Sequence, residues 1–351
     1  MAEDDQARLA VKGAPDKLDT AAKADRPDRT RLPLEDAPDK PTELSKRSWM
    51  DVLKRTVKEF NDDNLTDWAA ALTYYGVLSI FPGILVLLSL SGLLLTDTTQ
   101  NAVLTNAQQL FPPSIAEPVT GAIDELKKGS GAAGILAIVG LLGAVWTASG
   151  YVGAFMRAAN AIYDVPEGRP FWKVLPIRLG ITIAVGALIS VAALSIVFTG
   201  RFAEQAGGWV GLSKQAVDVF DIAKWPVLLL VVLLILALLY WASPNARQTG
   251  FRWITPGGGL AVLIWLLASA GFAIYVSNFS SYNKTYGALG GIIAFLVWLW
   301  ISNIAILLGA EFDAELERGR AIEGGMPADK EPFMPLRDSR KVKEEHDIGL
   351  S

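Results

Sequence analysis

The sequence lacks cysteine altogether and has a single histidine, His346, among its 351 residues. Without cysteine there is neither a disulfide framework nor a cysteine metal site. One histidine in a polar tail also leaves no zinc hydrolase site and no Ser-His or Cys-His pair. The glycine run at residues 257–259 lacks the lysine of a phosphate-binding loop. We therefore expect no enzyme activity, cofactor or metal site, although magnesium on carboxylates remains formally open at Asp62, Asp63, Asp67 and Glu311.

The first 44 residues lack any apolar run, which excludes a cleavable signal peptide there. Their mixed charges and five prolines predict a disordered cytoplasmic tail. The chain's net charge of -4 gives no indication of nucleic-acid binding. The first membrane span is then expected to act as an uncleaved signal-anchor.

Long apolar runs dominate the rest of the chain, whose mean hydropathy is +0.33. Runs of about 20 such residues are typical of transmembrane helices. They predict an all-α, polytopic integral membrane bundle over residues 45–318, followed by a disordered cytoplasmic tail at 319–351. Six spans are the best count, and four would require two re-entrant runs. The six are residues 68–95, 133–155, 177–199, 225–241, 260–276 and 288–310.

The distribution of lysine and arginine predicts the orientation of these spans. Thirteen basic residues flank one side and six flank the other, so both termini are expected in the cytoplasm. Pro176, Pro226 and Pro256 are each expected in the first turn of a helix, where no backbone bond is lost.

A basic amphipathic helix is expected at residues 45–60, just before the first span. Its apolar positions recur at helical spacing. Two interpretations remain open: contact with anionic lipid headgroups, or packing on the cytoplasmic end of the bundle. Its basic residues are Lys46, Arg47, Lys54, Arg55 and Lys58.

Two spans carry features that favour a solute site. The first contains Pro82, which kinks a helix, one or two turns after a polar group. The last begins with glycines that either form a packing seam or let the backbone unwind beside a ligand. Small residues also predict seams in the second and third spans, around Ala144 and Gly180. The candidate kink and ligand-lining residues are Thr73, Tyr74, Tyr75, Pro82, Gly287, Gly290 and Gly291.

Glu311 ends the last apolar run and is the nearest thing to an ionisable residue inside a span. Asp67 and Arg157 are predicted at the same membrane face, so the three are a candidate cytoplasmic polar cluster. The alternative is an ordinary helix end that meets lipid headgroups. Glu315 and Arg318 follow on the same helical face and are expected to pair.

Two stretches resemble the signatures of the YihY / virulence factor BrkB family. The first span contains DWAAALTYY at residues 67–75 and SIFP at 79–82; the last contains YGALGGII at 286–293 and LGAEFDAELER at 308–318. The likeness covers about residues 46–320. It implies a six-span protein of the bacterial inner membrane. Members were long labelled ribonuclease BN, and one branch is linked to serum resistance.

The function expected from these features is transport or envelope maintenance involving a lipid-like or small amphiphilic solute. The alternative is a scaffolding membrane protein that recruits partners through its tails. A tRNA-processing ribonuclease is least consistent with the residues, because the chain has one histidine and no cysteine.

Overall fold

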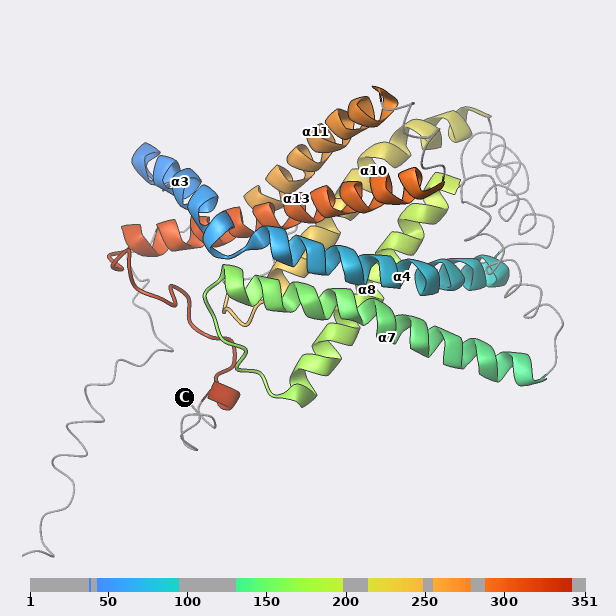
Figure 1. Cartoon of the computed structure of the whole chain (residues 1–351), viewed down its shortest axis with the longest axis horizontal. Coiled ribbons are helices and arrows are strands. Elements are labelled where there is room, and N and C mark those ends of the chain that lie inside the picture. The colour runs from blue at the N-terminus through green and yellow to red at the C-terminus, as the bar shows by residue number, and fades with distance from the viewer. Residues whose placement is uncertain are drawn as a thin grey trace, which may run out of the picture.

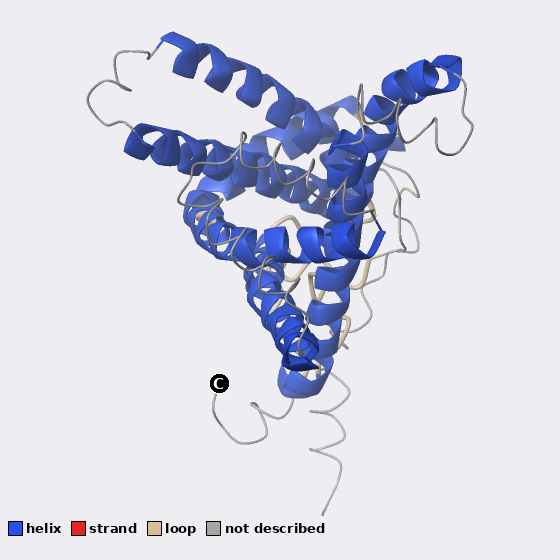
Figure 2. Ribbon diagram, turned by 90° about the vertical axis from the view of Figure 1, so that its right-hand side faces the viewer, coloured by secondary structure: helices blue, strands red, loops and turns tan. Residues whose placement is uncertain are grey.

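The computed structural model describes residue 38 and residues 43–94, 131–197, 214–248, 255–278 and 288–342. Within these ranges the regular structure is helical, with a single isolated bridge between Ala246 and Leu336 (Figure 2). The all-α class predicted from the sequence is confirmed. The helices are α3 (Lys46–Asp62), α4 (Leu65–Leu94), α7 (Gly131–Ile162), α8 (Phe171–Val197), α10 (Lys214–Ala242), α11 (Pro256–Asn278) and α13 (Ala288–Glu323).

Four helices in the described ranges have a segment long and apolar enough to cross a membrane. The segments are Phe171–Ala193, Ile222–Ala242, Pro256–Ser277 and Gly290–Glu323. The helices α4 and α7, of 30 and 32 residues, occupy the first two predicted spans. Since α4 continues from Leu65 to Leu94 as one helix, its backbone is not interrupted at residue 82.

The helices pack most closely in two pairs, α4 with α7 and α11 with α13 (Figure 1). The helix α13 also contacts α3 and α4, while α8 bridges α7 and α10. Buried side chains gather at one end of this arrangement, at the start of α4 and α11 and the end of α7, α10 and α13. The opposite ends carry large apolar side chains that are exposed, such as Ile222, Ile274 and Ile292. We call the first the closed end and the second the open end.

A very close backbone approach joins α11 to α13. A Cβ atom on Gly257 would lie 2.0 Å from the carbonyl oxygen of Gly309, and one on Gly309 would lie 2.5 Å from that of Gly257. Glycine is required at both positions because any side chain would force the helices apart. The backbone N–H of Gly257 also donates to Asp313 Oδ1 at 2.7 Å.

The packing seams expected elsewhere are only partly present. Gly180 and Gly291 have open space around them, so neither marks a helix contact. Ala144 is buried, but the close contact on α7 comes later, where Gly150 faces the ring of Tyr75. A small-residue spacing identifies a candidate contact face without saying whether a neighbouring helix covers it.

Two of the three prolines also differ from the expectation. Pro176 and Pro226 lie inside α8 and α10, which begin at Phe171 and Lys214. The residues that precede each proline are helical, so both helices begin before the predicted spans. Pro256 begins α11 as expected.

The disordered tail expected from residue 319 is wrong for residues 319–342. The helix α13 continues to Glu323, and the segment that follows packs on the bundle with Phe333 and Met334 buried. Asn245 holds this segment: its Nδ2 donates to the carbonyl of Asp338 at 2.9 Å, and its own carbonyl accepts from Arg337 N–H at 2.6 Å. The predicted tail at residues 1–44 lies largely outside the described residues, as do residues 343–351.

Candidate functional site

The closed end gathers carboxylates from three separate parts of the chain. Asp63 caps α3 through its N–H to the carbonyl of Glu59, and Asn64, at φ 52°, turns the chain into α4. Asp164, at φ 50°, ends α7 in the same left-handed conformation, which aspartate and asparagine tolerate better than most residues. These two tight turns place Asp63 and Asp164 near the C-terminal half of α13.

Glu311 lies at the centre of this group. The residue is 1% exposed, and its carboxyl is within hydrogen-bonding contact of the Asp63 carboxyl. Its Oε2 atom has no hydrogen-bond partner among the described residues. Buried polar atoms are nearly always paired, so an unpaired carboxyl oxygen marks this position for attention.

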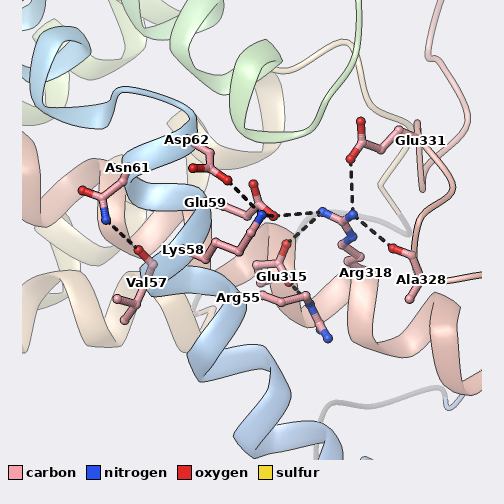
Figure 3. Close-up of polar contacts among 10 residues, drawn as sticks. All are labelled: Arg55, Val57, Lys58, Glu59, Asn61, Asp62, Glu315, Arg318, Ala328 and Glu331. Carbon is pink, nitrogen blue, oxygen red and sulfur yellow. Dashed lines mark hydrogen bonds and ion pairs between the residues drawn. The ribbon is translucent and has the colours of Figure 1, made fainter.

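Two arginines neutralise the neighbouring acids, as Figure 3 shows. Arg55 of α3 binds Glu315, which is 2% exposed. Arg318 reaches Glu315 at 3.5 Å, Glu59 at 3.7 Å and Glu331 at 3.3 Å. The pairing expected between Glu315 and Arg318 is therefore present, within a network that ties α3 and the C-terminal segment to α13.

The electrostatics of this end are dominated by burial and like charge. Burial, followed by the negative charges of Asp164 and Glu59, raises the pKa of Asp63 to about 7. Burial and the charge of Glu331 raise the pKa of Asp164 to about 6, against the opposing effect of Arg318. Both carboxyls therefore titrate close to neutral pH.

The predicted cluster of Asp67, Arg157 and Glu311 is not assembled. Asp67 and Arg157 are both exposed, and neither forms a salt bridge within the described ranges, whereas Glu311 is buried against Asp63. The prediction took Asp67 as the partner because it precedes the first apolar run. Asp63 takes that place because the α3–α4 turn folds it back onto α13.

Thr73 belongs to a hydrogen-bonded group between three helices. Asn303, 1% exposed in α13, donates to Thr73 Oγ1 at 3.1 Å and accepts from the Tyr151 hydroxyl of α7 at 2.9 Å. Thr73 itself donates to the carbonyl of Ala69. This group fastens α4, α7 and α13 together with neutral side chains.

The other candidate ligand-lining residues are dispersed. Tyr74 is exposed, Tyr75 is half-buried against α7, Gly290 is half-buried and Gly291 is exposed. The side chain of Pro82 and the whole of Gly287 lie outside what the structure describes. The residues predicted to line one site are thus not brought together in the described part of the chain.

Sequence reasoning missed Arg178 of α8, which lies inside a candidate span. Its Nε donates to the carbonyl of Ser149 and its Nη2 to the Ser149 hydroxyl, both at 2.7 Å. The guanidinium also lies 5.7 Å from the ring centre of Trp146. The sequence contains the signal, because a single arginine follows Pro176 within an apolar run, but it was counted only as a flanking charge.

The described residues contain no group of three or more histidine, cysteine or acidic side chains that could hold a metal ion. Of the carboxylates named for magnesium, Asp62 binds Lys58 at 2.8 Å and Glu311 contacts Asp63.

Comparison with known proteins assigns this helical membrane architecture to a family. The profile of the virulence factor BrkB family matches residues 56–332. The chain belongs to that family. The family match begins within α3 and ends beyond α13, so the BrkB unit includes the last part of the amphipathic helix and part of the segment that packs on the closed end. The resemblance seen in the two sequence signatures is confirmed.

Several relatives of this BrkB chain are known from other bacteria. It is 34% identical to the ribonuclease-like protein YfkH of Bacillus subtilis over 74% of this chain and 92% of that one. It is 30% identical to a UPF0761 membrane protein of Chromohalobacter salexigens, over 80% and 67% of the two chains. A UPF0761 membrane protein of Aggregatibacter aphrophilus is 26% identical over 75% and 91%. No solved structure matches. The protein is a multi-pass membrane protein of a bacterial family.

Proposed function

We propose that this BrkB protein moves a lipid-like or small amphiphilic solute across the bacterial inner membrane. In this proposal six helices, α4, α7, α8, α10, α11 and α13, span the bilayer with both termini in the cytoplasm. The alternation of buried and exposed ends supports it. Consecutive helices enter and leave the closed end in turn, which is the pattern that six successive crossings would produce.

The observation that carries the proposal is the exposure of whole helix segments at the open end. In α13, residues 291–293 and 295–297 are all exposed, as are residues 273–277 in α11. Since 3.6 residues complete a turn, the run in α11 is exposed on every face of that helix, whereas α13 keeps one half-buried face at positions 290, 294 and 298. A helix that only met lipid on its outer side would show one exposed stripe. Apolar surface is thus open within the bundle, and acyl chains suit such a surface.

The closed end supplies the second requirement of a transporter, a barrier on one side of the membrane. The Gly257–Gly309 crossing brings α11 and α13 into backbone contact there. The Tyr240 hydroxyl of α10 donates to the carbonyl of Ile306 at 2.6 Å, next to the same crossing. A bundle closed at one end and open at the other is the form expected for one state of an alternating-access cycle.

The scaffolding alternative is less well supported. Its C-terminal tail would have to be free to recruit partners, whereas Phe333 and Met334 of that tail are buried on the bundle. We further propose that the protein is not a ribonuclease. The name of the YfkH relative describes that protein and is not transferred to this chain. The proposal would be contradicted if the purified protein degraded tRNA and lost this activity when a residue in one of its membrane-spanning helices was changed.

The amphipathic helix α3 supports a contact with anionic lipid headgroups. It packs on α13 through Val52, while Met50, Leu53 and Val57 form an exposed apolar stripe at i, i+3 and i+7 spacing. Lys58 and Arg55 are engaged by Asp62 and Glu315, which leaves the lipid contact to Lys46, Arg47 and Lys54. Changing these three to glutamine should reduce the phosphatidylglycerol that co-purifies with the protein; an unchanged lipid content would contradict the contact.

Transport is tested with purified protein in vesicles that contain fluorescent phospholipid and single-chain amphiphiles. Probe that starts in the inner leaflet should move to the outer leaflet, where a membrane-impermeant quencher reaches it, only in protein-containing vesicles. Gly291→Trp should slow this movement without unfolding the protein, because no atom lies within 4 Å of the added Cβ. Lys330→Trp, outside the spans, is its matched control. If none of these amphiphiles moves faster than in protein-free vesicles, the proposal fails.

The orientation can be tested with single cysteines, because the chain has none of its own. Ser277→Cys should react with an impermeant maleimide in spheroplasts whose inner membrane is intact. Asp329→Cys should react only after permeabilisation. The reverse pattern would contradict cytoplasmic termini.

A further inference from the structure

Glu311 is a buried acid of the closed end, and one oxygen of its carboxyl has no hydrogen-bond partner among the described residues. It is 1% exposed, and Oε2 has no partner in the described part of the chain. A bare carboxylate is costly in such a place, and buried carboxylates are normally held by cations or by several N–H groups. The nearest carboxyl, that of Asp63, cannot serve as a donor if it is ionised.

The contact between the two carboxyls itself requires a proton. Two ionised carboxylates within hydrogen-bonding contact repel each other, so such a pair keeps one proton between them. Asp63 and Glu311 are in that contact, across the boundary between the α3–α4 turn and α13. The unpaired Oε2 then belongs to a carboxyl whose other oxygen takes part in the shared bond.

The surrounding charges leave the pair without a cation. Arg55 and Arg318 are bound to Glu315, Glu59 and Glu331. Neither Asp63 nor Glu311 has a salt bridge among the described residues. The titratable and charged groups that face the pair come from α3, from the turn after α7, from α13 and from the C-terminal segment: Arg55, Glu59, Asp62, Tyr163, Asp164, Asp313, Glu315, Glu317, Arg318 and Glu331. They are mainly acidic and favour proton retention.

We propose that Asp63 and Glu311 form a proton-binding site whose shared proton holds the α3–α4 turn against α13. Asp63 is half-buried and so gives the proton a route to the aqueous side, whereas Glu311 is sealed in the bundle. Loss of the proton places two adjacent negative charges beside Asp164 and Glu59, which loosens the turn. The pKa of Asp63, about 7, marks the loss of the first proton from the pair, so the remaining shared proton is held at and above neutral pH. The site goes beyond the transport proposal and stands without it.

The site is tested by infrared spectroscopy of the full-length protein in lipid vesicles. A protonated carboxylic acid has a carbonyl band that is separate from the carboxylate band and shifts in D₂O. Wild-type protein should show this band at neutral pH and lose it only as the pH is raised into the alkaline range. Asp63→Asn and Glu311→Gln should each remove the band, because the introduced amide replaces the shared proton as donor to the remaining carboxylate.

Asp62→Asn is the matched control, since Asp62 is adjacent and exposed but pairs with Lys58. It should leave the band unchanged. Both amide variants preserve side-chain shape, and helical circular dichroism with a single elution peak shows whether they fold. Absence of the band from wild-type protein at pH 6, or its persistence in both folded variants, would overturn the site. Neither outcome depends on whether vesicles show lipid movement, so the two proposals fail separately.

Discussion

The crossing of α11 and α13 gives the sharpest test of how the bundle is held together. Replacing Gly257 with alanine would put the new Cβ 2.0 Å from the Gly309 carbonyl oxygen and 2.6 Å from Asp313 Cγ. Ordinary contacts begin at about 3.4 Å, so the two backbones must separate by more than 1 Å. Backbone atoms cannot rotate out of the way as a flexible side chain would.

The cost follows from two losses. Overpacking of a tight contact costs about 1–3 kcal/mol. The same movement stretches the 2.7 Å bond from Gly257 N–H to the Asp313 carboxylate, and a bond to a charged group contributes about 1.5–3 kcal/mol. Partial loss of both gives a destabilisation of about 3–5 kcal/mol. At about 2–4 °C per kcal/mol, the melting temperature should fall by roughly 10 °C.

The assay is thermal unfolding of the purified protein in mild detergent, followed by tryptophan fluorescence. Gly259→Ala is the control on the same helix, because its added Cβ meets no atom within 4 Å. That change should be neutral or should stabilise by about 0.5–1 kcal/mol, as expected for glycine to alanine in a helix. If Gly257→Ala and Gly259→Ala melt together, α11 and α13 do not cross as described.

Three further changes test other parts of the bundle in the same assay. Asn303→Leu leaves the Tyr151 hydroxyl unpaired and should lower the free energy of unfolding by about 1–3 kcal/mol. The double variant Asn303→Leu with Tyr151→Phe should recover part of this loss. Equal melting temperatures of the single and double variants would refute the reasoning. Phe333→Ala should cost about 3–5 kcal/mol, whereas exposed Lys330→Ala should have almost no effect; a free tail would make both neutral. Asp63 keeps its proton up to about pH 7 when folded but only to about 3.8 when unfolded, so its contribution to stability falls between these values as pH rises. The full shift corresponds to about 4 kcal/mol, which partial exposure reduces to about 2, and Asp63→Asn should remove that slope.

The helical membrane class was predictable because long apolar runs have few other uses in a protein. The start of α11 at Pro256 and the amphipathic helix before α4 follow from similarly local signals. The starts of α8 and α10 were not predictable from hydropathy. A partly polar segment extends α10 ahead of its apolar run, and Pro176 and Pro226 are tolerated inside α8 and α10.

Only half of the site was predictable. Glu311 can be recognised in the sequence because it ends an apolar run, whereas the identity of its partner depends on a turn. Asp67 is closer to the span in sequence, yet it is exposed and Asp63 takes its place. A single left-handed residue, Asn64, decides which carboxylate faces α13. The packing of the C-terminal segment was not predictable for a related reason. Its few apolar residues, such as Phe333, are too sparse to form a sequence pattern, yet they are buried against the folded bundle.

The helix α13 links the two proposals physically. Its first half is exposed over most of its surface at the open end, and its second half carries Gly309 and Glu311 at the closed end. A helix transmits displacement along its length. A change in the Asp63–Glu311 contact must therefore either be absorbed at the glycine crossing, two residues before Glu311, or move the half of α13 that lies at the open end. The crossing is too tight to absorb it, because its backbones are already in contact. Charge on the carboxyl pair and the width of the open end are therefore expected to change together, and Glu311→Gln, which retains the contact without a proton, should fix α13 in the closed-end arrangement described here.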